Sequence, residues 1–215
     1  MMKKVYKFDL VRELVIITCI TTCFIFFAFF YQYHLYFIEQ MQLFRLGWYY
    51  IINYFNKPAS IACLLGDFLT QFYFIKFAGA VILTACFLLL WYLFNRSIYR
   101  VASWKCSYLL ALPLTVVAIM FHLDFLYPLA ATISLIIALI VFLFYSSITA
   151  NRKRIIAGIV IVPLLYIIAG YAIYVFVVFA LLHELIVKRC AWLNLVYSLR
   201  IGNRKIRIND MEIIR

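Results

Sequence analysis

The run IIAGIVIVPLLYIIAGYAIYVFVVFALLHELIV, residues 155–187, decides how this chain folds, because it carries no charged residue before Glu184. As one helix it would be about 50 Å long, at a rise of about 1.5 Å per residue, whereas the hydrocarbon core of a bilayer is about 30 Å thick. Ala169 and Gly170 lie near its midpoint, and glycine accepts the backbone angles that a tight turn needs. The run therefore predicts a hairpin of two short helices, 155–169 and 172–187, that turns at Gly170.

Four further segments are apolar enough to cross a membrane, at residues 14–36, 77–94, 107–121 and 129–148. The chain is 68% hydrophobic and only 13% charged, which is more apolar surface than a soluble core of this size can bury. We therefore expect an all-α fold. We expect this fold to be a polytopic membrane helix bundle over residues 1–190, with six transmembrane helices, followed by a cytoplasmic basic tail at 191–215.

The distribution of basic residues supports six spans, because Lys and Arg in short loops favour the cytoplasmic side of a membrane. With six spans, 17 of the 20 basic residues lie on one side, and only Arg45, Lys57 and Lys76 lie on the other. With five spans the tail changes sides and the division becomes ten against ten. Both termini are therefore expected in the cytoplasm. Because the basic residues cluster beside apolar spans, the partner they indicate is the lipid bilayer and not a nucleic acid.

The first outer loop, residues 37–76, has the pattern of two interfacial helices. The first covers residues 35–47, with an apolar stripe that begins at Phe37. The second runs from Ser60 to Phe74, with one apolar side formed by Ile61, Leu64, Leu65, Phe68 and Phe72. Its other side is polar and consists of Ser60, Cys63, Asp67, Thr70 and Gln71. The aromatic residues between the two helices, including Trp48 and Tyr54, are typical of the headgroup level.

If the polar sides of these helices face each other, they bound a shallow cleft that holds Glu39 and Asp67. Near lipid such carboxylates are candidate general bases, or ligands of a divalent cation together with Gln42 and Gln71. The alternative is that they only keep interfacial helices hydrated. We take Glu39 and Asp67 as candidate catalytic residues. The candidate binding residues are Gln42, Arg45, Thr70 and Gln71. No spacing singles out a metal site, and the sequence names no cofactor.

Polar residues elsewhere in the chain indicate structural roles. The centres of the predicted spans carry no charge, which argues against a coupled transporter and leaves a passive facilitator open. Glu184 precedes Lys188 by four residues, which predicts a surface ion pair on one helix. Asp124 is expected to be a turn or cap residue, and His34 and His122 to lie at the membrane interface.

Several pieces of the chain resemble a known family. They are FIEQMQLF at 37–44, the Lys57-Pro58 pair, GDFLTQFY at 66–73 and AGA at 78–80. Over residues 10–190 the chain is similar to an uncharacterised family of bacterial polytopic inner-membrane proteins, domain-of-unknown-function family 6057. Members of this family are usually longer, with further spans. The resemblance implies a bacterial inner membrane and supplies no activity.

A weaker likeness is architectural. Polytopic glycosyltransferases that use lipid-linked sugars also place a long outer loop, with interfacial helices and an acidic catalytic residue, after their first span. This chain has Glu39 and Asp67 in that place, but it lacks the paired acidic motif of many such enzymes and has fewer spans.

The leading hypothesis is an accessory or scaffold subunit whose outer loop docks a membrane-protein partner or a lipid headgroup. The alternative is a lipid-linked sugar or headgroup transferase, or the membrane half of one, that uses Glu39 or Asp67. A passive facilitator is the third possibility.

Overall fold

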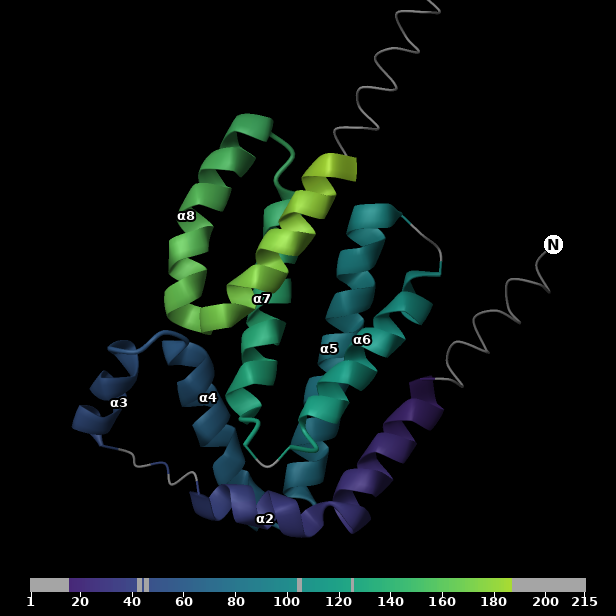
Figure 1. The fold of residues 1–215 in the computed structure, drawn as a ribbon, viewed down its shortest axis with the longest axis vertical. Coiled ribbons are helices and arrows are strands. Elements are labelled where there is room, and N and C mark those ends of the chain that lie inside the picture. The colour runs from purple at the N-terminus through teal and green to yellow at the C-terminus, as the bar shows by residue number, and fades with distance from the viewer. Residues whose placement is uncertain (1–15, 42–43, 45–46, 104–105, 125, 187–215) are drawn as a thin grey trace, which may run out of the picture.

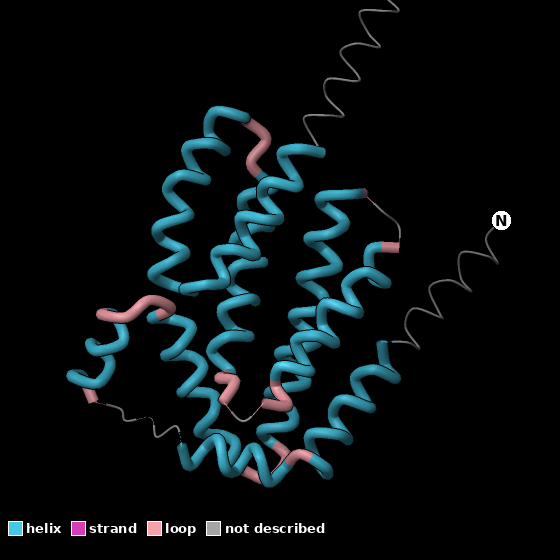
Figure 2. The backbone as a smooth tube through the Cα atoms, viewed as in Figure 1, coloured by secondary structure: helices cyan, strands magenta, loops and turns pink. Residues whose placement is uncertain are grey.

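The structure is a computed structural model that describes residues 16–41, 44, 47–103, 106–124 and 126–186. All regular structure in these residues is helical, as Figures 1 and 2 show, so the predicted all-α fold is confirmed. The chain begins with a helix at Ile16–Phe30, whose last turn is the π-helix η1, Phe26–Phe30. The following elements are α2 (Gln32–Met41), α3 (Trp48–Phe55), α4 (Ser60–Thr70), η2 (Gln71–Phe74), α5 (Ala78–Ala102), α6 (Ser107–Phe121), α7 (Leu129–Ser147), α8 (Asn151–Ala169), η3 (Gly170–Ala172) and a helix at 173–186.

Three helical stretches of the described residues are long and apolar enough to cross a membrane: Ala78–Ala102, Leu129–Ser147 and Lys153–Ile186. The count rises to four if Ile16–Phe30 and α2 together form one span. Helix α6 is apolar but shorter, with 15 residues. The fold is therefore compatible with a multi-pass membrane protein, and the expected number of six spans stays a prediction.

The chain turns back on itself at Gly170, as the sequence predicts, so Lys153–Ile186 is not one straight helix. Figure 1 shows α8 and helix 173–186 running in opposite directions on either side of η3. The backbone angle φ of Gly170 is +59°, in the region that favours glycine. Arg154 and Glu184 lie 2.5 Å apart between Nε and Oε1, although 30 residues separate them. This contact fixes the register of the two arms.

The first predicted span, 14–36, ends earlier than expected. The helix axis changes direction by 69° between Ile16–Phe30 and Gln32–Met41. The bend occurs at Tyr31, which is buried and donates a hydrogen bond from its hydroxyl to the carbonyl oxygen of Leu123 at 2.9 Å. A π-helical turn directly before it supplies the break in the regular helix. As a result α2 lies across one end of the bundle (Figure 1).

We name the two ends of the bundle by what they carry. The α2 end holds α2, η2 and the turn between α6 and α7. The basic end is the opposite end, where Arg96, Arg100, Lys153 and Arg154 lie.

Helix α4 packs against the bundle through small residues. Ser60, Ala62, Gly66 and Thr70 are buried, and a Cβ atom on Gly66 would lie 2.7 Å from the backbone nitrogen of Ala130 in α7. Small side chains allow two helices to approach this closely. The predicted polar side of this helix is therefore partly internal, because Ser60 and Thr70 are buried. The predicted apolar side is partly exposed, with Ile61, Leu65, Phe68 and Phe72 each 37–39% accessible.

Candidate functional site

Asp67 lies on α4 and is bound by the neighbouring helix. The hydroxyl of Tyr54 in α3 donates a hydrogen bond to Oδ2 of Asp67 at 2.5 Å. Thr70 is fully buried and donates from Oγ1 to the backbone oxygen of Asp67 at 2.9 Å, within its own helix. Asp67 therefore joins α3 to α4, while the hydroxyl of Thr70 donates within its own helix, and its predicted binding role stays a prediction.

Gln71 is hydrogen-bonded to the segment that leads from α2 to α3. Its Nε2 donates to the carbonyl oxygen of Phe44 at 3.0 Å. The ring of Phe44 also meets the ring of Phe68 edge to face, with centroids 6.0 Å apart. The amide of Gln71 is thus used inside the protein. Gln42 and Arg45, the other two predicted binding residues, lie outside the described residues.

Glu39 lies on α2 and is half-buried. Among the described residues, no hydrogen bond or ion pair joins Glu39 to Asp67, and no group of three His, Cys, Asp or Glu side chains could hold a metal ion. The structure brings Asp67, Thr70 and Gln71 together on one helix and its 3₁₀ extension. It does not join them to Glu39 by a polar contact, so the predicted catalytic pair stays a prediction.

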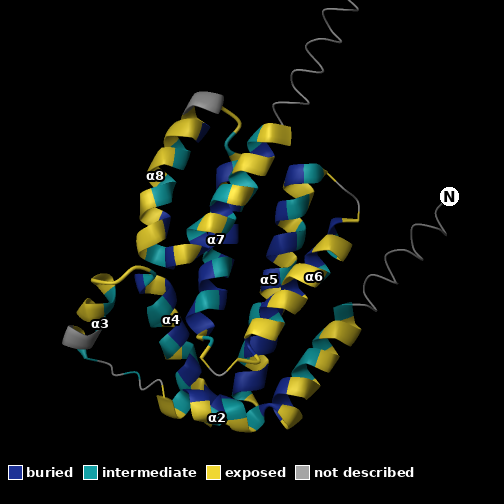
Figure 3. Ribbon diagram, viewed as in Figure 1, coloured by how far each residue is buried: buried dark blue, intermediate teal, exposed yellow. Residues whose placement is uncertain are grey.

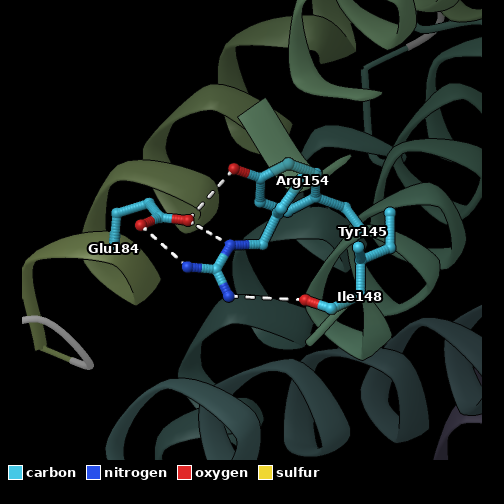
Figure 4. A network of polar contacts seen from close by, with 4 residues as sticks. All are labelled: Tyr145, Ile148, Arg154 and Glu184. Atoms are coloured by element: carbon cyan, nitrogen blue, oxygen red, sulfur yellow. Dashed lines mark hydrogen bonds and ion pairs between the residues drawn. The ribbon is translucent and has the colours of Figure 1, made fainter. Parts of the chain in front are cut away.

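A polar cluster at the basic end was not predicted. Arg154 of α8 binds both carboxylate oxygens of Glu184, at 2.5 Å from Nε and 3.1 Å from Nη2 (Figure 4). Tyr145 of α7 donates its hydroxyl to Oε1 of Glu184 at 3.3 Å, and Nη1 of Arg154 donates to the carbonyl oxygen of Ile148 at 3.4 Å. Two-point contact of this kind is the strong form of an Arg–carboxylate pair. The cluster ties three helices together.

The sequence held a signal for this pair. Arg154 lies 15 residues before Ala169 and Glu184 lies 15 residues after it, so a turn at that point places them opposite each other. The expected partner of Glu184 was instead Lys188, which lies outside the described residues.

His122 was expected at the membrane interface. That location stays a prediction, and the structure adds that the His122 side chain is internal. It follows the last residue of α6, is buried, and lies 2.6 Å from Oγ1 of Thr132 through Nε2. Burial lowers the pKa of His122 to about 4, because the charged imidazolium loses hydration. Asp124 behaves as the turn residue that was expected, since its Oδ1 accepts a hydrogen bond from the backbone N–H of Leu126 at 3.1 Å.

The model of a family of unknown function, DUF6057, matches residues 7–202 of this chain. The chain belongs to this family. The predicted resemblance to DUF6057 is therefore confirmed. No curated protein and no solved structure matches the chain significantly.

Membership of DUF6057 carries no activity to transfer, so the contacts themselves must indicate function. In this member of DUF6057, Asp67 of α4 and Gln71 of η2 hold segments of the chain to one another. Arg154 and Glu184 do the same at the basic end.

Proposed function

We propose that this DUF6057 protein is an accessory or scaffold subunit of the bacterial inner membrane, and that its first outer loop docks a membrane-protein partner or a lipid headgroup. The proposal rests on two hydrogen bonds inside the protein, one between Asp67 and Tyr54 and one between Gln71 and Phe44. A carboxylate that already accepts a short hydrogen bond from a neighbouring helix is better suited to holding two helices in a fixed arrangement than to transferring protons.

The surface proposed for docking is the exposed side of α2. Tyr33, Phe37 and Met41 are exposed there, on a helix that lies across the end of the bundle (Figure 1). Exposed aromatic and methionine side chains are typical of protein contact surfaces.

The proposed orientation has both termini in the cytoplasm. It is supported by the described basic residues, since Arg96, Arg100, Lys153 and Arg154 all lie at the basic end. Basic residues near the ends of membrane helices favour the cytoplasmic side. The α2 end then faces outward. The expected number of six spans is a separate expectation, on which the docking role does not depend.

Photocrosslinking in cells tests the docking role. A photoreactive phenylalanine analogue replaces Tyr33 or Met41, and the same analogue at Val116 on α6 is the control for contact with bulk lipid. The proposal expects an adduct of discrete mass from Tyr33 and Met41 and none from Val116. A protein adduct identifies a partner and a lipid adduct identifies a headgroup, whereas adducts of the same kind from all three positions contradict docking.

The same experiment separates the scaffold from the transferase. Asp67→Asn and Glu39→Gln remove one carboxylate each but leave the exposed side chains of Tyr33, Phe37 and Met41 in place, so the adduct from Tyr33 should persist in both variants. If purified protein transfers a group from a lipid-linked sugar and either variant abolishes that turnover, the transferase hypothesis replaces the scaffold.

A further inference from the structure

The turn between α3 and α4 meets the turn at Gly170. Ser60, the first residue of α4, donates from Oγ to the carbonyl oxygen of Ile167 in α8 at 2.9 Å. The backbone N–H of Ala59 donates to the carbonyl oxygen of Tyr166 at 3.4 Å. A Cβ atom on Gly170 would lie 2.9 Å from Cβ of Ala59, so the two turns are in direct contact. Figure 1 shows the α3–α4 pair and the α8 hairpin approaching each other from opposite ends of the bundle.

This junction lies far from both ends of the bundle. At the α2 end, Tyr73 of η2 packs against Gly79, the second residue of α5, where an added Cβ would lie 3.1 Å from Cδ1 of Tyr73. Ser60 precedes Tyr73 by 13 residues, which is about 20 Å of helix. Ile167 follows Arg154 by 13 residues, which again is about 20 Å. The contact between Ser60 and Ile167 therefore lies near the middle of the bundle.

The apolar surface continues from this level to the α2 end. The C-terminal half of α6, which is nearest the α2 end, exposes Val116, Val117, Met120 and Phe121. Figure 3 shows exposed residues along α6. Along α4 and η2 the large exposed residues are again apolar, and they include Ile61, Leu65, Phe68 and Phe72. If the bilayer ended at the Gly170 turn, all of this surface would face water. A contiguous apolar surface of this kind is normally covered.

We infer that α3 and α4 form a re-entrant hairpin, which enters the bilayer from the α2 end and ends at the Gly170 turn, and that bilayer hydrocarbon covers the exposed side of α4. The small residues of α4 then face α7, and its larger apolar residues face lipid. Helix α4 fills the half of the membrane that the short α8 hairpin does not reach. In this arrangement the chain crosses the membrane fully four times, with one half-depth hairpin from each side, instead of the six crossings predicted above.

The backbone N–H groups of residues 57 and 59 at the tip are satisfied by protein, as non-helical backbone at membrane depth requires. The N–H of Ala59 bonds Tyr166, the N–H of Lys57 donates to Tyr54 O at 3.1 Å, and Pro58 has no N–H. This placement must accommodate two charged residues, Asp67, which is half-buried and accepts the hydrogen bond from Tyr54, and Lys57, which is exposed. Ala59 and Ser60, two and three residues after Lys57, contact the C-terminal end of α8, where the helix dipole favours a cation.

Depth measurements test the inference, with the full chain reconstituted in phospholipid bilayers. In a variant that lacks the six native cysteines, a nitroxide is attached at position 61, 65, 68 or 72. Collision with oxygen reports the hydrocarbon and collision with a water-soluble nickel chelate reports the aqueous side. The ratio of oxygen to nickel collisions should rise stepwise from Phe72 to Ile61, which corresponds to about 16 Å of depth over 11 residues.

Matched positions calibrate this gradient. Labels at Met120 and Val116 on α6 should show a similar gradient, and labels at Phe37 and Met41 on α2 should differ little from each other. Equal depth at all four α4 positions would overturn the inference, because it is the result for a helix that lies flat in the interface.

If the cysteine-free variant does not fold, trifluoromethyl-phenylalanine at positions 61 and 72 of the native chain gives the same comparison, through the relaxation of its fluorine signal by oxygen and by nickel. The inference shares only the membrane location with the proposed function. A flat α4 would therefore leave docking at α2 unaffected, and a failed crosslink at α2 would leave the gradient unaffected.

Discussion

Arg154 and Glu184 form an ion pair in which both side chains are mostly withdrawn from solvent, with 7% and 21% of their side-chain surface accessible. Removing water from two charges costs free energy, which their attraction and further hydrogen bonds must offset. Tyr145 and the carbonyl oxygen of Ile148 supply those hydrogen bonds. If one partner is removed, the other is left as a buried charge without compensation.

We predict that Arg154→Met lowers the free energy of unfolding by about 3 kcal/mol, because Glu184 keeps its burial and loses its cation. Thermal unfolding of the purified protein in mild detergent measures the change. Lys153→Met is the matched control, since Lys153 is the adjacent residue and is exposed. Equal melting temperatures for the two variants would show that the ion pair does not stabilise the hairpin.

His122 is a second buried polar residue, and it lies near the α2 end, at the opposite end of the bundle from Arg154 and Glu184. Its pKa is lowered from 6.5 to about 4 because burial disfavours the charged ring. The folded protein therefore binds fewer protons at this site than the unfolded chain does between these two values. The associated stability is fully present above about pH 6.5 and is lost as the pH falls towards about 4.

We predict that acidification from about pH 7 to about pH 5 removes about 2 kcal/mol of stability through this residue. His122→Gln should reduce this loss, because the amide stays neutral throughout. Melting temperatures at the two pH values provide the test. An unchanged pH dependence in His122→Gln would contradict the assignment.

At the scale of the element, the α8 hairpin depends on the backbone of one glycine. Gly170 has φ +59° and ψ −130°, and a Cβ atom there would lie 2.9 Å from Cβ of Ala59. Both the backbone angle and the neighbouring turn therefore exclude a side chain. Gly158, in the body of α8, has an ordinary environment, because its nearest neighbour would be Cε2 of Tyr145 at 3.4 Å.

We predict that Gly170→Ala destabilises the protein by about 2 kcal/mol, from strain at positive φ and from contact with the α3–α4 turn. Gly158→Ala is expected to be neutral or to stabilise by up to about 1 kcal/mol, since alanine favours the helix. Melting curves of the two variants give the comparison. The hairpin geometry would be wrong if Gly158→Ala were the more damaging substitution.

At the scale of the whole molecule, charge separates the two ends of the bundle. Arg96, Arg100, Lys153 and Arg154 lie at the basic end, whereas Lys76 lies at the α2 end with its ammonium 5.2 Å from the ring centroid of Phe77. An uneven distribution of this kind orients membrane proteins.

We predict that Cys106, which is exposed between α5 and α6, is inaccessible to a membrane-impermeant maleimide added to the outside of the inner membrane. A cysteine in place of Leu126, at the α2 end, should be labelled by the same reagent. The measurement uses chains with one cysteine each, and permeabilised membranes provide the control in which both react. The reversed pattern would reverse the proposed orientation.

Features that depend on residues close together in the chain can be predicted from the sequence, whereas features that depend on contacts between distant residues cannot. The turn at Gly170 was predictable, because an apolar run that is too long for one span has two small residues, Ala169 and Gly170, near its midpoint. The bend at Tyr31 was not, because residues 26–38 contain neither glycine nor proline to mark it, and the bend depends on a bond to Leu123. Asp67 was recognised as unusual, but its partner Tyr54 lies across a turn whose geometry has no pattern in the sequence.

The sequence by itself determined the helical class, the presence of helices long and apolar enough to cross a membrane, and the turn at Gly170. These follow from the length and hydrophobicity of contiguous segments and from one backbone preference. Only the tertiary structure decided which side of α4 is internal, which group binds Asp67, and that Arg154 pairs with Glu184. These depend on how closely two helices approach and on which residues meet across space. Small residues such as Gly66 permit that approach, but they become informative only when the partner helix is known.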